Sequence, residues 1–114
     1  MKTTIKAKNF ELTPTLEGFI EEKFDGLAKF ADITEVIVEV KKETKHHRKG
    51  DIFVAGSQIG MPGKQIVAEA TSDDLFKAII ESRDELKMEI EKYKVKKIEN
   101  NRRKQKKLKK EIVK

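Results

Sequence analysis

The chain has 114 residues, no cysteine and a net charge of +6. This length suits one ordinary domain, and the lack of cysteine excludes disulfides, thiolate nucleophiles and sulfur-ligated zinc. The first residues lack the apolar core of a signal peptide, and no stretch approaches the roughly 18 apolar residues that span a bilayer, so we expect a soluble cytoplasmic protein.

The N-terminal part of the chain predicts a strand followed by a helix. Residues 3–10 alternate between apolar and polar side chains, as in a half-buried strand. A helix is predicted from residue 13 to about residue 28, because Thr13 can cap it and Pro14 fits its first turn. Its apolar residues recur at helical spacing: Leu16, Phe19, Ile20, Phe24 and Leu27.

Three more strands are predicted in the middle of the chain. Residues 34–42, 51–59 and 65–71 all alternate, and the turn residues Gly-Met-Pro-Gly at 60–63 join the last two as a hairpin. The side chains expected to face the core are Val36, Val38, Val40, Phe53, Ala55, Ile59, Ile66, Ala68 and Ala70.

A second helix is predicted to follow. Thr71 and Asp74 have the spacing of a capping box, and helical periodicity continues to Tyr93. Its apolar side chains are Leu75, Phe76, Ile79, Ile80, Leu86, Ile90 and Tyr93. The fold is therefore predicted to be α+β, in the order β-α-β-β-β-α, with two helices on one face of a four-stranded sheet. We expect residues 1–93 to form the domain and residues 94–114 a basic tail.

The charge is distributed unevenly. Residues 1–92 hold 15 Lys and Arg against 18 Asp and Glu, whereas residues 93–114 hold 11 against 2. A compact domain with such a basic arm is typical of polyanion binding, most often of nucleic acid, with an anionic membrane surface as the other candidate. The few apolar residues of the arm predict either a frayed helix or a segment that is disordered until it is bound.

Both histidines lie in the segment KHHRKGD at residues 45–51. Adjacent residues of a strand point to opposite faces, and no third histidine or cysteine completes a zinc site, so we expect neither a metal nor another cofactor. No serine or threonine is marked as a nucleophile for a catalytic histidine, and the segment GSQIGMPGK lacks the order of a phosphate-binding loop. The segment is thus interpreted as a basic loop between two strands, and the protein as a non-enzyme without a small-molecule substrate.

Aromatic platforms for stacked bases are scarce, since tryptophan is absent and Tyr93 is the single tyrosine. RNA contacts are therefore expected to be mainly to phosphate and sugar on a folded surface. At about 100° per residue, Arg83, Lys87 and Lys94 fall within about 40° of one another on the second helix. They either contact RNA or only extend their charged ends into water from apolar surroundings.

Two long segments resemble a known family. The sequence HHRKGDIFVAGSQIGMPGKQIVAEATSDDLFKAI (46–79), together with NFELTPTLEGFIEEKFDGLAKF (9–30), closely resembles the ribosome hibernation-promoting factors, also called ribosome-associated inhibitors or ribosomal subunit interface proteins. The resemblance covers residues 1 to about 95. It implies a β-α-β-β-β-α fold similar to a double-stranded-RNA-binding domain, and no catalysis.

The resemblance also implies a partner, the ribosome. Family members bind the small subunit in the channel between head and body, where they overlap the tRNA and mRNA positions and idle ribosomes during starvation or stationary phase. Longer members carry a second domain that pairs ribosomes. This chain ends before such a domain, so we expect the short form or an isolated N-terminal domain.

The basic residues of the family carry over unevenly. Lys23, Lys29 and Lys92 are basic as in the family, whereas Glu85, Met88 and Glu91 occupy positions where bases are common. The candidate RNA-binding residues are Lys23, Lys29, Lys45, Arg48, Lys49, Arg83, Lys87, Lys92, Lys94, Lys97, Arg102 and Arg103.

Two hypotheses follow from the sequence. In the first, the domain fills the decoding channel of the small subunit, contacts its rRNA and inhibits translation, while the basic arm supplies phosphate contacts in place of those lost on the second helix. In the second, the chain is a divergent protein-interaction module of the same fold, and the arm serves an acidic partner or a membrane surface. The basic arm favours the first hypothesis.

Overall fold

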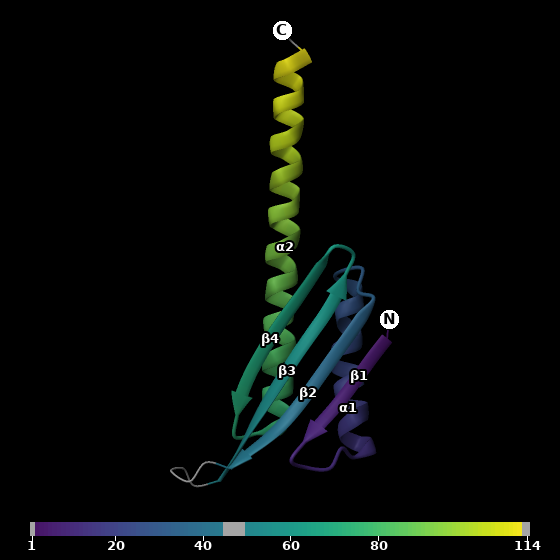
Figure 1. Cartoon of the computed structure of the whole chain (residues 1–114), viewed down its shortest axis with the longest axis vertical. Coiled ribbons are helices and arrows are strands. Elements are labelled where there is room, and N and C mark those ends of the chain that lie inside the picture. The colour runs from purple at the N-terminus through teal and green to yellow at the C-terminus, as the bar shows by residue number, and fades with distance from the viewer. Residues whose placement is uncertain (1, 45–49, 113–114) are drawn as a thin grey trace.

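The computed structural model describes the backbone of residues 2–44 and 50–112 and the side chains of residues 2–43 and 50–96. Its elements are β1 (Lys2–Lys8), α1 (Pro14–Asp25), the 3-10 helix η1 (Gly26–Lys29), β2 (Glu35–Thr44), β3 (Asp51–Met61), β4 (Lys64–Ser72) and α2 (Leu75–Ile112). The predicted fold class is confirmed, and both helices cover the same face of the sheet (Figure 1).

The four strands form one mixed sheet in the order β1-β2-β3-β4. β1 pairs with β2 in parallel, while β2–β3 and β3–β4 are antiparallel. A parallel pair needs a long crossover, and α1 with η1 provides it, whereas the two-residue turn at 62–63 suffices for the β3–β4 hairpin. β1 and β4 are therefore the two edges of the sheet.

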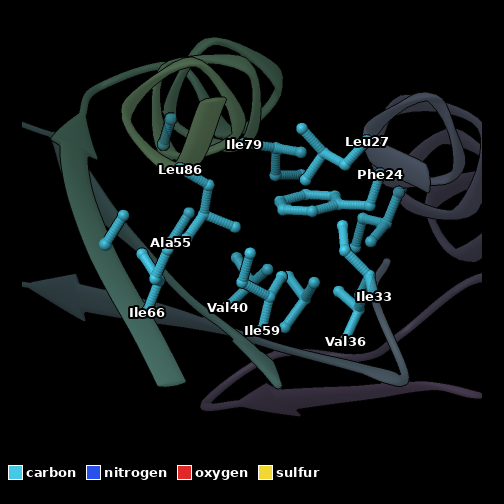
Figure 2. Packing of buried hydrophobic residues seen from close by; sticks show 14 of the residues in the cluster. Phe24, Leu27, Ile33, Val36, Val40, Ala55, Ile59, Ile66, Ile79 and Leu86 are labelled. Atoms are coloured by element: carbon cyan, nitrogen blue, oxygen red, sulfur yellow. The ribbon is translucent and has the colours of Figure 1, made fainter. Parts of the chain in front are cut away.

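The core lies between the sheet and the helices. The inward residues of β2, Val36, Val38 and Val40, are fully buried as predicted. Figure 2 shows how Phe24 and Ile79, from the two helices, meet above the strands. The other buried members of this cluster are Leu16, Ile20, Leu27, Ile33, Ala55, Ile59, Ile66, Ala68, Ala78, Leu86 and Ile90. The alternating pattern predicted from the sequence thus identifies the inward face of the sheet.

The helix termini follow the predictions only in part. The Thr13 hydroxyl accepts a hydrogen bond from the N–H of Leu16 at 3.2 Å, so Thr13 caps α1 as predicted. α1 ends at Asp25, and the chain tightens into η1 where one longer helix was predicted. The capping box predicted for α2 is wrong: the Asp74 carboxylate itself accepts the N–H groups of Phe76 and Lys77, at 2.9 and 3.3 Å.

α2 is longer than the sheet that it covers. It has 38 residues, which corresponds to about 57 Å, and its C-terminal half extends past the sheet (Figure 1). Of the two states that the sequence left open for the basic tail, the backbone has the helical one, without interruption to Ile112. Among the described residues, no helix has the length and apolarity that crossing a bilayer requires.

Candidate nucleic-acid interface

Aromatic rings lie in the contact between the two helices. Phe19 of α1 meets Phe76 of α2 edge to face, with ring centroids 4.8 Å apart and planes at 89°. Phe30 follows η1 and is half-buried, while Phe76 keeps 45% of its surface exposed. We call this line of contact, with the two lysines described next, the α1–α2 seam.

Two of the predicted lysines lie over these rings. The Nζ atom of Lys87 is 4.6 Å from the centroid of Phe30, and that of Lys23 is 5.5 Å from the centroid of Phe19. Both distances are within the range of a cation–π interaction, and both lysines are half-buried. Packing against a ring orients the stem of the lysine, and the N–H groups that point away from the ring remain available to an acceptor such as a phosphate oxygen.

The other predicted cations of the described region differ in their surroundings. Arg83, one turn before Lys87, is half-buried and pairs with Asp84, with Nη2–Oδ1 2.7 Å and Nε–Oδ1 3.0 Å. Lys92 is exposed, with its Nζ 3.4 Å from the Glu89 carboxylate. The remaining exposed cations are Lys29, at the end of η1, and Lys94, on α2. The helices thus bring Lys23 and Lys87 to the seam, while Arg83 lies one turn before Lys87 and Lys92 and Lys94 follow along α2.

Several predicted residues cannot be placed in this interface. Lys45, Arg48 and Lys49, with the two histidines between them, lie outside the described residues. For Lys97, Arg102 and Arg103 the structure describes a helical backbone without side-chain positions. Their role in RNA binding stays a prediction.

The sequence did not predict the role of the aromatic rings. Phe19 and Phe76 fit the apolar periodicity of their helices, so both are interpreted from the sequence as core residues. The sequence could have indicated that Phe76 lies near the cations, because Phe76 precedes Arg83 by seven residues and therefore lies on the same side of α2. Lys64, whose Nζ is 6.0 Å from the Tyr93 centroid, had no such signal, since only the folded hairpin brings it to α2.

Two of the three departures from the family pattern, Glu85 and Met88, point away from Lys87 on α2, whereas Glu91 lies one turn after Lys87 on the same side. Glu85, Met88 and Glu91 are exposed, and Met88 points about 100° away from its neighbour Lys87. Glu91 has the spacing from Lys87 that allows an ion pair, but the ion pairs among the described residues do not include one between them. The seam keeps its positive charge although this neighbouring surface of the helix has lost it.

The opposite face of the sheet carries cations of its own, since Lys6 and Lys8 of β1 are exposed there and Lys8 pairs in register with Lys41. It carries a shallow groove of about 570 Å³, which is lined among others by Ile37, Glu39, Lys41, Val54, Gly56 and Glu69. Acidic and basic side chains alternate there, and Lys41 is paired with Glu43 at 3.1 Å. Within residues 2–43 and 50–96, no group of three His, Asp or Glu side chains is placed to hold a metal ion.

Comparison with known proteins relates most of the chain to ribosome-associated factors. It is 29% identical over 98 residues to the ribosome hibernation promoting factor of Acinetobacter guillouiae, covering 82% of this chain and 87% of that protein. It is 30% identical over 95 residues to the factor of the same name from Klebsiella oxytoca, covering 82% and 94%. The ribosome-associated factor Y of Haemophilus influenzae is 29% identical over 92 residues, covering 81% of each.

Two solved structures share the fold. A ribosomal subunit interface protein from Coxiella burnetii superposes with a TM-score of 0.70 at 20% identity, over 83% of this chain and 99% of that one. The N-terminal domain of Protein Y from Thermus thermophilus gives 0.65 at 22% identity, over 82% and 99%. The model of one family matches residues 3–98, from β1 into the part of α2 that extends past the sheet. The chain therefore belongs to the Sigma 54 modulation protein / S30EA ribosomal protein family.

Proposed function

We propose that this protein is a non-catalytic regulator of translation that binds the ribosome in the cytoplasm. Membership of the family and relatives named as ribosome hibernation promoting factors support this proposal. The exposed cations of the described surface, among them Lys29, Lys92 and Lys94, support binding to a polyanion.

We further propose that the protein contacts rRNA, and the lysines of the seam support this. At the seam, Lys23 is held over the ring of Phe19, one turn earlier in α1, at 5.5 Å, and Lys87 of α2 over the ring of Phe30, which follows η1, at 4.6 Å. Lysines whose stems are already packed lose less side-chain entropy when they bind a phosphate than freely rotating ones. Beyond Tyr93, α2 continues into residues 94–112, which hold ten Lys and Arg against two acidic residues. Such a surface fits a polyanionic backbone.

We further propose that the domain occupies the decoding channel of the small subunit. The resemblance of residues 9–30 and 46–79 to hibernation factors implies this position, where tRNA and mRNA would otherwise bind. In this proposal residues 1–93 fill the channel by shape, and the arm at 94–114 contributes phosphate contacts.

Gradient sedimentation tests the proposal. The full chain, mixed with purified ribosomal subunits, should migrate with the small subunit at low salt and be released as salt rises, because each neutralised phosphate steepens the salt dependence. Absence of co-migration at low salt would contradict ribosome binding and favour the protein-interaction hypothesis. The channel position is tested separately: initiator tRNA should be displaced by the protein, and simultaneous binding of both would exclude that position while leaving ribosome binding intact.

A further inference from the structure

α2 exposes an apolar patch on the side that faces away from the core. Met88 and Val95 keep 51% and 56% of their surface exposed. They are seven residues apart, which places them on one face of the helix about two turns from each other. With Glu91, Lys92 and Lys96 they line a shallow and mainly apolar groove of about 560 Å³. Nothing else in the described part of the chain covers this patch.

The charges on the two sides of the patch are opposite. Toward the start of α2, a second groove adjoins it, and Met88 lines both. The acidic side chains of this second groove are Glu69, Glu81, Asp84 and Glu85. Toward the end of α2, residues 97–110 contain eight Lys and Arg and one acidic residue, Glu99. Along its length from Glu81 to residue 110, the sequence of α2 thus passes from an acidic part through the apolar patch to a basic part.

We infer that the occupant of this face is a second copy of the chain, whose α2 lies antiparallel to the first. A two-fold axis between Glu91 and Lys92 makes the pair self-complementary. Met88 then packs against the partner's Val95, and Glu91 lies opposite the partner's Lys92. In the same arrangement the acidic start of each exposed face lies along the basic extension of the other copy.

Charge and connectivity select this occupant over the alternatives. A parallel pair in register would place Glu91 beside Glu91 and Lys92 beside Lys92, and like charges at such positions repel. The basic extension of the same chain cannot fold back onto its own acidic groove, because α2 is one continuous helix. A nucleic acid fits the basic end of the face, whereas the apolar patch and the acidic groove disfavour it.

The shape of the molecule leaves room for the pair. The sheet lies on the other side of α2, and the extension passes beyond the sheet (Figure 1). In the antiparallel arrangement the domain of each copy lies beside the extension of the other. The long axis of 69 Å against a depth of 17 Å reflects this free helix, which a second helix can cover along its length.

Disulfide trapping tests the orientation, because the chain has no cysteine of its own. Met88→Cys and Val95→Cys variants of the full chain are oxidised separately and as a mixture, with thermal melting as the check that each is folded. A disulfide needs Cα atoms within about 7 Å. The antiparallel pair predicts fast cross-linking in the mixture and little in either variant alone. Cross-linking of Met88→Cys with itself as the main product would overturn the antiparallel arrangement.

Charge exchange tests the contact without cross-linking. By sedimentation equilibrium at low salt, Glu91→Lys should weaken self-association by roughly tenfold, since two attractive pairs become repulsive. The double variant Glu91→Lys/Lys92→Glu restores both pairs with opposite sign and should associate like the natural chain. Glu39→Lys, on the far face of the sheet, is the matched control and should change nothing. A natural chain that stays monomeric up to millimolar concentration, or a double variant as weak as the single one, would overturn the proposal.

Discussion

The ammonium group of Lys87 in α2 lies 4.6 Å from the centroid of the Phe30 ring, which ends η1. Phe30 itself packs against the buried core cluster, so the position of the ring is set by the fold. One basic side chain of the second helix is thereby held at the end of the first. The contact between Lys87 and Phe30 thus forms only in the folded protein, because the two residues come from different helices.

Replacement of Lys87 tests whether this position contacts phosphate. Lys87→Gln should lower the affinity for small ribosomal subunits and reduce the slope of log affinity against log salt by about one, as expected for one lost phosphate contact. Lys6→Gln is the matched control, since Lys6 is exposed on β1 and pairs in register with Glu39 of the outer groove. Binding titrations at several salt concentrations measure both slopes. Equal slopes for Lys87→Gln and the natural chain would contradict the contact.

The hydrogen bond between Ser57 of β3 and Ser82 of α2 is buried and 2.6 Å long. Ser82→Ala leaves the Ser57 hydroxyl without this partner, and a buried unsatisfied group costs about 1–3 kcal/mol of unfolding free energy. Ser57→Ala/Ser82→Ala removes both hydroxyls and should recover most of this loss. Urea unfolding of the three proteins measures the difference. A double variant no more stable than Ser82→Ala would show that the pair is not coupled.

The same substitution should have opposite effects at two glycines. Gly63 has φ = +74° in the β3–β4 turn, where a Cβ atom is strained, so Gly63→Ala should destabilise the protein by about 1–2 kcal/mol. Gly18 lies inside α1 with open space around it, so Gly18→Ala should stabilise by about 0.5–1 kcal/mol. Thermal melting compares the two variants. Melting temperatures that shift in the same direction would contradict this explanation.

The sequence predicted the sheet and its buried face because the alternation of apolar and polar residues that marks a strand is a local pattern. Val36, Val38 and Val40 alternate with polar residues, and this period of two suffices to assign both the strand and its inward face. The start of α2 was misjudged because several residues near 71–74 can cap a helix, and the choice depends on where the chain leaves β4. Asp74 is the residue that caps the helix, because its carboxylate accepts hydrogen bonds from the N–H groups of both Phe76 and Lys77.

Only the cations of the seam could be predicted from the sequence. Helical spacing groups Arg83, Lys87 and Lys94 on one side of α2, and this needs no tertiary information. The ring beneath Lys87 comes from residue 30, far away in the sequence, and is brought there by the packing of α1 and η1 on the sheet. The sequence therefore predicted the cations of α2, but it did not predict the aromatic ring against which Lys87 packs.

Removal of the arm tests its proposed role in binding. Deletion of residues 94–114 should leave the buried cluster intact, because Tyr93 is the last of the residues with described side chains that packs against it. The melting temperature should therefore change little, while the affinity for small subunits should fall steeply and its salt slope should decrease. Melting and binding titrations on the same two proteins measure this. Unchanged affinity would exclude phosphate contacts by the arm.

The most direct measurement maps the rRNA around each face of the bound protein. The cysteine-free chain accepts a single tethered hydroxyl-radical probe, placed by Lys29→Cys beside the seam or by Lys6→Cys on the other side of the sheet. The account predicts strong cleavage of small-subunit rRNA from the Lys29→Cys probe and weaker cleavage from Lys6→Cys. Stronger cleavage from Lys6→Cys, or none from Lys29→Cys on a protein that still binds, would contradict the claim that the seam faces rRNA.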